Sequence, residues 1–391
     1  MSFPDQLTIP REVLRIAEKL EGEGFETWCV GGAIRDTLLQ QPHADFDLAT
    51  AARPEDVRRL FKRTVPVGIE HGTVAVLDSH NKPHEVTTFR KDIRTDGRHA
   101  EVEFGVSLQD DLARRDFTIN AIAYHPLKRE WRDPFEGATD LDKKLIRSVG
   151  DPNWRFQEDY LRILRALRFS ARFEFRIHPR TMEAAKANSQ GLAQLSAERV
   201  RDEWFKGIAT ARRVSRLVAL WREVGAARIW LPETVNAPEP SRVDALPRDP
   251  VLVSSFLAGD PASLLTRLKC SARDIERARA IREWRDRYPD PRHLPAVRRW
   301  LADTGPAADD LLALLPALDV GAAATRVPEA VAGVRQAGDP ISLKALAVNG
   351  DDLIAAGVRP GPEVGETLQR LLGEVLDQPE RNTREYLLSR V

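Results

Sequence analysis

The sequence predicts an α+β protein, with a small mixed α/β head followed by an all-helical neck, body and tail. Strand and helix patterns mix over the first 125 or so residues, strand patterns almost vanish from Asp151 onward, and helical periodicity dominates the remainder. With 391 residues, 42% of them hydrophobic, the chain can build several packed units. We therefore expect a head at 1–150, a neck at 151–231, and a body and tail at 232–391.

The head begins with an amphipathic helix, because Val13, Ile16 and Leu20 recur at helical spacing. Two glycines interrupt the strand pattern that follows, and Pro54 stands where a first helical turn tolerates proline. The expected elements are helices at 10–23, 33–39 and 54–61, and strands at 27–30, 45–50, 73–77, 85–89 and 102–104.

The rest of the chain reads as helical at 156–172, 196–230, 250–287, 292–317 and 342–390. A proline-rich stretch at 232–250 marks a boundary, and residues 328–340 are expected to form another linker or bend. Three tryptophans at helical positions are expected to be core residues: Trp204, Trp221 and Trp230.

Charge is unevenly distributed along the chain. Lys+Arg and Asp+Glu both number 59, so the net charge predicts no nucleic-acid partner. Residues 1–150, however, carry 22 basic and 26 acidic side chains, whereas residues 151–230 carry 16 basic and nine acidic ones. A basic middle beside an acidic head is typical of an enzyme that handles a polyanion.

Two sequence features limit the location and class of the protein. The only cysteines, Cys29 and Cys270, are far apart, which excludes a disulfide framework or a zinc ribbon. The chain does not open on a signal peptide, and no apolar run reaches the roughly 18 residues that span a membrane. We expect a cytoplasmic protein without membrane contact.

Three carboxylates form the first chemical feature. Asp45 and Asp47 are two residues apart in a predicted strand, so their side chains share a face and can share divalent cations. Glu85, in a second predicted strand, supplies a third carboxylate. Nucleotidyl transfer needs such a cluster, because Mg²⁺ activates the attacking hydroxyl and neutralises charge on the phosphates. Alone, an aspartate pair with this spacing also fits the solvated edge of a strand.

A glycine turn lies just upstream, in residues 31–36 (GGAIRD). Gly31 and Gly32 lead into a helix, whose first backbone N–H groups and dipole suit a triphosphate. Arg35 supplies a cation beside it. A Gly-Gly pair is by itself a common turn, so this feature gains meaning only from the carboxylates that follow.

Four segments resemble the polymerase-β-like nucleotidyltransferase superfamily, in the form of class II CCA-adding enzymes and bacterial poly(A) polymerases. They are residues 31–47, whose G-G-x-x-R-D is followed by D-x-D, residues 112–121 (LARRDFTINA), residues 158–162 (EDYLR) and residues 197–203 (AERVRDE). The resemblance covers about residues 25–205. Beyond residue 230 only the helical character agrees.

The resemblance implies a role for each matching residue. The segment around Arg115, Asp116 and Asn120 is expected to hold ribose and phosphates, and Asp159 and Arg162 to select the base. Arg165 and Arg168 are placed near the nucleotide, although their spacing alone would also fit a basic helix edge.

The base-selecting role also has a physical argument. On a continuous helix, Asp159 and Arg162 would be neighbours on one face. A carboxylate accepts hydrogen bonds and a guanidinium donates them, which matches the amino group and ring nitrogen of cytosine and adenine. Uracil and guanine would leave buried groups unpaired, at a cost of about 1–3 kcal/mol each.

Two segments bear on which member of the family this is. Residues 67–74 (VGIEHGTV) are similar to a G-x-x-H-G-T stretch of CCA-adding enzymes, where poly(A) polymerases usually have a basic run. Residues 91–101 resemble the flexible loop that complete CCA-adding enzymes use when switching from C to A. We expect full CCA addition; partial addition, poly(A) tailing and a silent RNA-binding protein are the alternatives.

The expected reaction is in-line attack of the tRNA 3′-OH on the α-phosphate of CTP or ATP. Asp45 and Asp47 would hold two Mg²⁺ ions, and Glu85 would act as third carboxylate or base. The expected partner is the acceptor and TΨC arms of tRNA, and the sequence identifies no protein partner. The side chains expected to contact the tRNA phosphates are Arg172, Arg176, Arg180, Lys206, Arg212 and Arg213.

Overall fold

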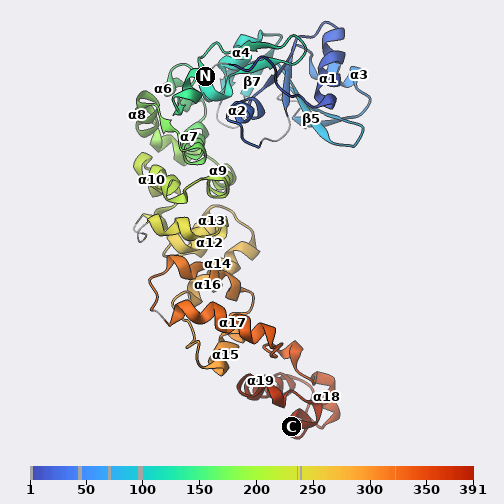
Figure 1. The fold of residues 1–391 in the computed structure, drawn as a ribbon, viewed down its shortest axis with the longest axis vertical. Helices are drawn as coiled ribbons and strands as arrows, with labels where there is room; N and C mark the ends of the chain where they lie inside the picture. The colour runs from blue at the N-terminus through green and yellow to red at the C-terminus, as the bar shows by residue number, and fades with distance from the viewer. Residues whose placement is uncertain are drawn as a thin grey trace. The chain divides into compact units, whose positions relative to one another are not determined.

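The computed structural model describes residues 3–42, 46–68, 72–95, 100–235, 237, 240–321 and 323–391, without the side chains of 92–95, 100–102 and 240. The chain divides into two compact units, Met1–Pro232 and Glu233–Val391. The strands and α1 to α11 belong to the first unit and α12 to α20 to the second. Figure 1 colours the chain from blue at the N-terminus to red at the C-terminus. The domain limits expected at 150/151 and 231/232 stay a prediction.

The head of the first unit mixes strands with short helices. Its helices are α1 (Arg11–Gly22), α2 (Gly32–Leu38), α3 (Pro54–Leu60), α4 (Leu108–Ala113), the 3₁₀ turn η2 (Thr118–Asn120) and α5 (Gly137–Asp142). Its strands are β1 (Thr27–Val30), β2 (Asp47–Thr50), β3 (Thr64–Gly68), β4 (Thr73–Leu77), β5 (Pro83–Thr88), β6 (Arg90–Thr95), β7 (Ala100–Phe104), β8 (Ala123–His125), β9 (Glu130–Arg132) and β10 (Leu145–Ile146).

A seven-stranded mixed sheet organises the head, in the order β3-β4-β5-β2-β1-β8-β9. Its neighbours are antiparallel except for β2 and β5, which run parallel with Leu48 opposite Val86. Among the described head strands, the sequence patterns missed β3, β6, β8, β9 and β10. Strand β3 contains Pro66 beside a register shift, and β8 and β9 have only three residues each, too few to show alternation.

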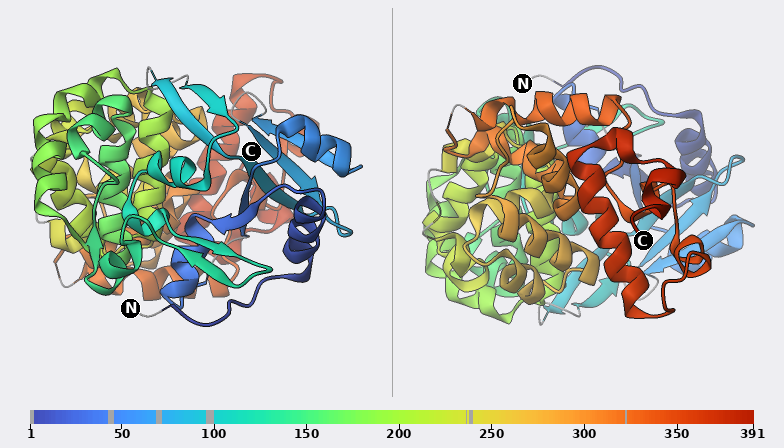
Figure 2. Two further views of the ribbon diagram at one scale, coloured as in Figure 1. Left: turned by 90° about the horizontal axis from the view of Figure 1, so that it is seen from above. Right: turned by 90° about the horizontal axis from the view of Figure 1, so that it is seen from below.

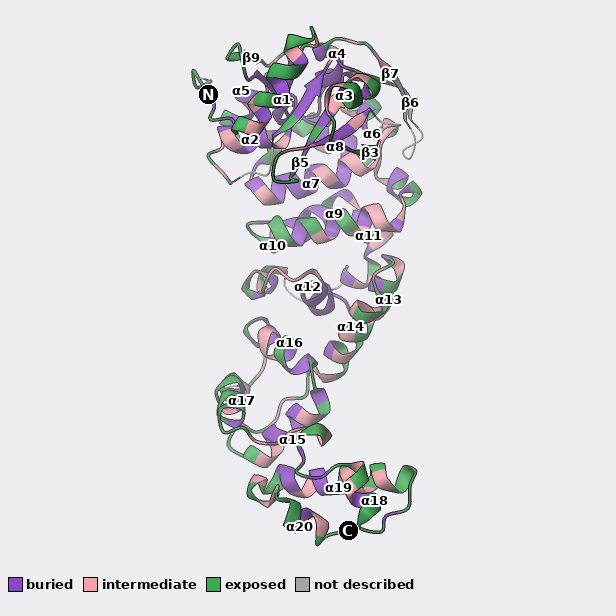
Figure 3. Ribbon diagram, turned by 90° about the vertical axis from the view of Figure 1, so that its right-hand side faces the viewer, coloured by how far each residue is buried: buried purple, intermediate pink, exposed green. Residues whose placement is uncertain are grey.

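Both faces of this sheet are covered by apolar side chains. Leu48 and Val86 belong to one core together with the buried face of α1, where Val13, Ile16 and Leu20 are buried as their spacing predicts. Ala49, the next residue of β2, belongs to a second core with Leu112 of α4 and other residues. Successive residues of β2 therefore face opposite sides of the sheet. Figure 3 colours the buried residues of the chain purple.

The neck follows the head within the first unit. It contains α6 (Pro152–Glu158), α7 (Leu161–Phe173), β11 (Arg176–Ile177), α8 (Pro179–Ala187), η3 (Ser189–Gln194), α9 (Ala197–Thr210), α10 (Val214–Val224) and α11 (Ala226–Trp230). Ala166, Phe169 and Phe173 of α7 belong to the same core as Leu48, so this helix is anchored on the head. Figure 2 shows the green neck helices grouped beside the blue and cyan strands.

The neck corrects one expectation about helix continuity. The helix expected at 156–172 is broken at Asp159, whose backbone is extended with φ −154° and ψ 103°. Its carboxylate accepts a hydrogen bond from the backbone N–H of Leu161 at 3.0 Å, which satisfies an amide of the first turn of α7. Trp204 and Trp221 are buried core residues as expected, and the half-buried Trp230 donates to the carbonyl of Leu192.

The second unit is helical throughout its described residues. Its elements are η4 (Pro232–Thr234), which begins one residue before it, η5 (Pro240–Ala245), α12 (Pro250–Leu257), α13 (Pro261–Arg267), α14 (Ala272–Trp284), α15 (Leu294–Thr304), α16 (Ala307–Leu314), η6 (Leu315–Ala317), η7 (Ala324–Arg326), α17 (Val327–Gln336), η8 (Leu343–Ala345), α18 (Gly350–Ala355), α19 (Pro362–Asp377), η9 (Pro379–Arg381) and α20 (Arg384–Leu388).

The expected linker at 328–340 is wrong, because most of it forms α17. Pro328 stands in the first turn of that helix, where a backbone N–H would have no helical partner and proline is tolerated. Among the described residues no helix is long and apolar enough to cross a membrane. The predicted fold class, an α+β head followed by a helical remainder, is confirmed.

Candidate active site

Asp47 and Glu85 lie at neighbouring positions on one face of the sheet. Each directly precedes one member of the parallel pair Leu48–Val86, and both members point into the same core. Since side chains alternate along a strand, Asp47 and Glu85 point to the opposite face, and both are exposed. Asp45 lies outside the described residues. The described pair supplies only oxygen donors, which is the ligand chemistry of a hard divalent cation.

Gly31 brings Asp47 and Arg115 together. It follows β1 with φ +78°, a left-handed conformation that favours glycine, and Gly32 begins α2. A Cβ atom at Gly31 would lie 3.3 Å from Nη1 of Arg115 and 3.6 Å from Oδ2 of Asp47. The turn therefore stands between a carboxylate and a guanidinium, and a side chain there would be strained and would crowd both.

Arg35 lies in the interior, although the sequence suggested a cation open to phosphate. Its side chain is 4% exposed, its Nε and Nη2 bind Asp36 at 2.8 and 2.7 Å, and its Nη1 donates to Asn120 at 2.5 Å. The guanidinium also lies 5.0 and 4.8 Å from the ring centres of Phe169 and Phe173 in α7. Burial lowers the pKa of Arg35, against the opposing effect of Asp36. Arg35 thus fastens α2 to the neck, and its predicted contact with a triphosphate stays a prediction.

Asp116 is the centre of a polar network between head and neck. Its Oδ1 accepts from the backbone N–H of Phe117 and from Nδ2 of Asn120, both at 2.8 Å. Its Oδ2 accepts from Nε and Nη2 of Arg165 at 2.8 and 2.7 Å. Burial alone would raise the pKa of Asp116, but the charge of Arg165 and these hydrogen bonds outweigh it and lower the pKa to about 2. Asp116 is therefore ionised and fixed.

The guanidiniums of Arg165 and Arg168 both lie beside the carboxylate of Glu203 in α9. Nε of Arg168 binds Glu203 at 2.6 Å, and its guanidinium lies 4.2 Å from the ring centre of Phe169. Arg168 is 8% exposed, so the structure places it inside the neck. Arg165 is about one-third exposed and lies 3.9 Å from Glu203. Of the two, Arg165 is the one that remains accessible to a ligand.

Asp159 and Arg162 are held separately, because they do not lie on one continuous helix. The second carboxylate oxygen of Asp159 accepts from Arg199 of α9 at 2.8 Å. Arg162, in the first turns of α7, binds Glu158 at 3.1 Å and donates to the carbonyl of Arg114 at 3.2 Å. The expected helical face is thus wrong, but both side chains are fixed at the boundary between α6 and α7, and Arg162 reaches the head.

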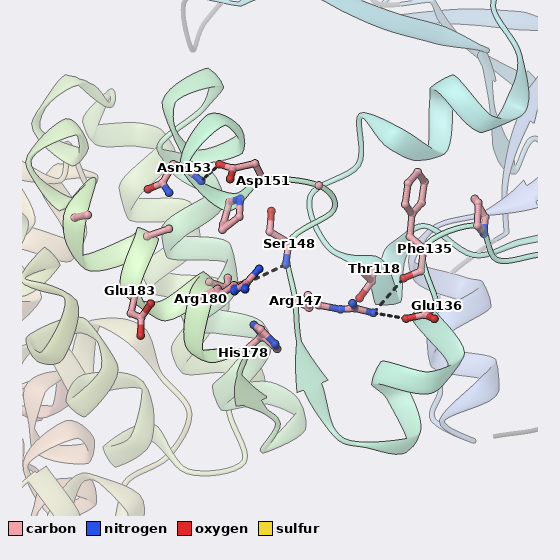
Figure 4. A pocket seen from close by; sticks show the side chains of 16 residues that line it. Thr118, Phe135, Glu136, Arg147, Ser148, Asp151, Asn153, His178, Arg180 and Glu183 are labelled. Atoms are coloured by element: carbon pink, nitrogen blue, oxygen red, sulfur yellow. Dashed lines mark hydrogen bonds and ion pairs between the residues drawn. The ribbon is translucent and has the colours of Figure 1, made fainter.

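A separate pocket of about 1220 Å³ lies between the end of the head and α8. Figure 4 shows Arg147 paired with Glu136 on one side, at 3.3 Å, and Arg180 and His178 on the other. None of the predicted nucleotide-binding residues lines it. The pocket is therefore distinct from the arrangement around Gly31.

Known protein families match the head, the neck and the C-terminal part of this chain. Family models match for the head domain of poly(A) polymerase (residues 27–147), the RNA and SrmB-binding site of polymerase A (174–237) and tRNA nucleotidyltransferase domain 2 (320–391). The CCA-adding enzyme of Limosilactobacillus fermentum is 34% identical, over 95% of this chain and 94% of the relative. That of Lacticaseibacillus paracasei is 36% identical, over 97% and 95%.

The chain belongs to the family of CCA-adding enzymes. A solved structure agrees: the Bacillus stearothermophilus CCA-adding enzyme in complex with CTP is 30% identical with a TM-score of 0.80, over 97% of both chains. The predicted family and the predicted enzyme class, a tRNA nucleotidyltransferase, are confirmed.

Sequence reasoning missed several residues that support the site of this family member. Asp111 is fully buried and binds both Arg114, at 2.7 Å, and Arg115, at 3.0 Å. Asp111 precedes Arg114 and Arg115 by three and four residues at the end of a helix, a spacing from which these ion pairs could have been predicted. The motif around Glu203 was recognised without a role for its residues, and the partnership of Arg199 with Asp159 joins positions 40 apart, which no local pattern shows.

Proposed function

We propose that this chain adds CCA to the 3′ end of tRNA from CTP and ATP, with release of pyrophosphate. The observation that carries the proposal is the meeting of Asp47 and Arg115 at the Gly31 turn, in a chain of the CCA-adding family. Carboxylates beside a phosphate-binding turn are the parts that nucleotidyl transfer requires. The solved relative in complex with CTP supports the same substrate class.

In each step the 3′ oxygen of the RNA forms a bond to the α-phosphorus of the nucleotide, and the bond from that phosphorus to the bridging oxygen of pyrophosphate breaks. The guanidinium of Arg115 lies at the Gly31 turn, where its positive charge can bind the triphosphate. Asp116 and Asn120 form the fixed acceptor and donor pair that would hold the ribose hydroxyls. Glu85 lies beside Asp47 as the third carboxylate or the base for the hydroxyl proton.

Mg²⁺ is the metal that we propose for this site. Asp45 and Asp47 would hold two Mg²⁺ ions, and the exposed oxygen donors of Asp47 and Glu85 suit hard cations. When bound, the ions would lower the pKa of the attacking hydroxyl and neutralise charge on the phosphates. Removal of divalent ions should therefore abolish incorporation.

Base selection is proposed for Asp159 and Arg162. Asp159 is oriented by Leu161 and Arg199, and each carboxylate oxygen can still accept a further hydrogen bond. It can therefore accept from the amino group of cytosine or adenine, while Arg162 donates to the ring nitrogen. Uracil and guanine present a carbonyl and a ring N–H at these positions. The carboxylate of Asp159 would then face another acceptor, and the guanidinium of Arg162 would face another donor.

The neck offers cations for the tRNA backbone. The exposed candidates are Arg176, Arg180, Lys206, Arg212 and Arg213, whereas Arg172 is half-buried and bound to Asp36 at 2.9 Å. Arg212 and Arg213 lie beside Glu174, at 3.8 and 3.0 Å, so part of their charge is compensated. Phosphate contacts from such side chains would hold the tRNA in register without reading its sequence.

Primer extension tests the proposal. The protein, Mg²⁺ and tRNA transcripts that end at the discriminator base, at C or at CC are incubated with CTP, ATP or both, and the products are resolved to single nucleotides. Growth by CCA followed by a stop is expected. A stop at CC, or growth of the CC-ended transcript alone, would indicate a partial enzyme. Long A tails would indicate a poly(A) polymerase, and no growth would indicate an RNA-binding protein.

A further inference from the structure

Two successive main-chain carbonyls of the head are held by arginines of the neck. Nη2 of Arg155, in α6, donates to the carbonyl oxygens of Arg114 and, at 3.0 Å, of Arg115. Arg162 donates to the same carbonyl of Arg114 at 3.2 Å. Arg155 is 9% exposed, so these contacts are made in a nearly dry environment where hydrogen bonds to a charged donor are strong.

These two carbonyls set the direction of the substrate-facing side chains. They belong to the peptide bonds that join Arg114 to Arg115 and Arg115 to Asp116, so rotating either peptide would move Arg115 and Asp116. Arg115 projects from this backbone to the Gly31 turn, and Asp116 projects to Asn120 and Arg165. Asp111 fixes the side chain of Arg115 from the head, while Arg155 fixes its backbone from the neck.

Arg155 is also tied to the base-selecting arginine. Oε2 of Glu158 accepts from Nη1 of Arg155 and, at 3.1 Å, from Nη1 of Arg162. The two guanidiniums therefore share a carboxylate oxygen and the carbonyl of Arg114. A displacement of Arg155 would disturb Arg162 and the backbone of Arg115 together.

We propose that Arg155 is a positioning residue that couples base selection by Arg162 to the hold of Arg115 and Asp116 on triphosphate and ribose. Arg155 acts through these residues without touching the nucleotide. The inference rests on the proposed function, because it assumes that Arg115, Asp116 and Arg162 contact the incoming nucleotide.

Kinetics of Arg155→Lys, measured at saturating tRNA, test the coupling. Lysine keeps the positive charge but lacks the planar guanidinium. Its compact ammonium group cannot bind the two carbonyl oxygens and the carboxylate of Glu158 at the same time. We expect the KM for CTP and for ATP to rise about tenfold, the effect of one hydrogen bond to a charged group. The preference for CTP over UTP should fall by a similar factor. The KM for tRNA, measured separately at saturating CTP, should stay within about twofold.

Arg298→Lys is the matched control. Arg298 is also 9% exposed and likewise binds a carboxylate, Asp339 at 2.6 Å, and a main-chain carbonyl, that of Leu376 at 3.2 Å. It lies in the unit Glu233–Val391. Its replacement should lower the midpoint of unfolding without changing the KM for CTP or the preference for CTP over UTP.

A second variant keeps the test decisive if Arg155→Lys does not fold. Glu158 is about one-third exposed, so Glu158→Gln should fold, and it removes the charge shared by Arg155 and Arg162. It should weaken the preference for CTP over UTP. Unchanged KM values and preference in either folded variant would overturn the coupling. Failure of the proposed function would show differently, as a wild-type protein that extends no primer.

Discussion

Asp116 and Arg165 form a two-point ion pair in which one carboxylate oxygen accepts from Nε at 2.8 Å and from Nη2 at 2.7 Å. The pair joins the segment after α4 in the head to helix α7 in the neck. Because Asp116 also holds Asn120, and Asn120 holds Arg35, a single chain of polar contacts runs from the neck to the glycine turn.

This ion pair makes stability depend on pH in a defined window. The folded pKa of Asp116, about 2, lies below its ordinary value of 3.8, so its contribution is fully present above pH 4 and is lost as the pH falls toward 2. Its size is about 2 kcal/mol. The free energy of unfolding by urea should therefore be higher for wild type than for Asp116→Asn at pH 6, and the pH-dependent part of the difference should shrink to about a third at pH 2.5. A difference independent of pH would contradict this account.

Arg35→Lys should cost stability more than it costs nucleotide binding. The substitution removes the fork that joins Asp36 to Asn120 and the contacts with two rings, so a loss of about 2–4 kcal/mol is expected in urea unfolding. Arg59→Lys is the control, because Arg59 is 59% exposed and should change stability by less than about 0.5 kcal/mol. Unchanged stability with weak nucleotide binding would instead make Arg35 a phosphate ligand.

Gly31→Ala should damage activity beyond its effect on stability. The φ of +78° disfavours alanine by about 1–2 kcal/mol, and the added Cβ would crowd Arg115 and Asp47. Gly24→Ala is matched, since Gly24 has φ +86° with nothing within 4 Å of its Cβ position. Both variants should lose similar stability, but only Gly31→Ala should lower kcat/KM for CTP, by at least about tenfold. Equal activities in the two variants would argue against the Gly31 turn as the substrate site.

Charge reversal on the neck should weaken tRNA binding in a salt-dependent way. Arg176→Glu and Arg180→Glu each remove an exposed cation, so the slope of log Kd against log salt should fall by about 1 per lost phosphate contact. Arg59→Glu, on α3 of the head, is the comparison and should leave the slope unchanged. The phosphate assignment fails if the neck variants keep the wild-type slope.

Local patterns predicted most of the elements but not how the neck meets the head. The strand expected at 45–50 is largely β2, with Asp47 exposed and the next residue, Leu48, buried, because strand periodicity is a local property. The break in the helix at Asp159 was missed. The carboxylate of Asp159 accepts a hydrogen bond from the backbone N–H of Leu161, and the sequence does not distinguish such an aspartate from one on the face of a continuous helix.

The environment of the arginines could not be predicted for a related reason. Arg35, Arg155 and Arg168 each have a partner at least 35 residues away in sequence, namely Asn120, the carbonyl of Arg115 and Glu203. A motif identifies such a residue as important, but only tertiary contacts decide whether it faces a ligand or fastens two elements.

The most direct test of the central claim is single-turnover extension by Asp47→Asn on tRNA ending at C and at CC. In the proposed mechanism both additions use one site at Asp47, so the variant should lose C and A addition alike, by on the order of a thousandfold. Its affinity for tRNA should stay near wild type, since the substitution preserves the side-chain shape and leaves the proposed phosphate contacts of the neck intact. Persistent addition of either nucleotide would contradict the account.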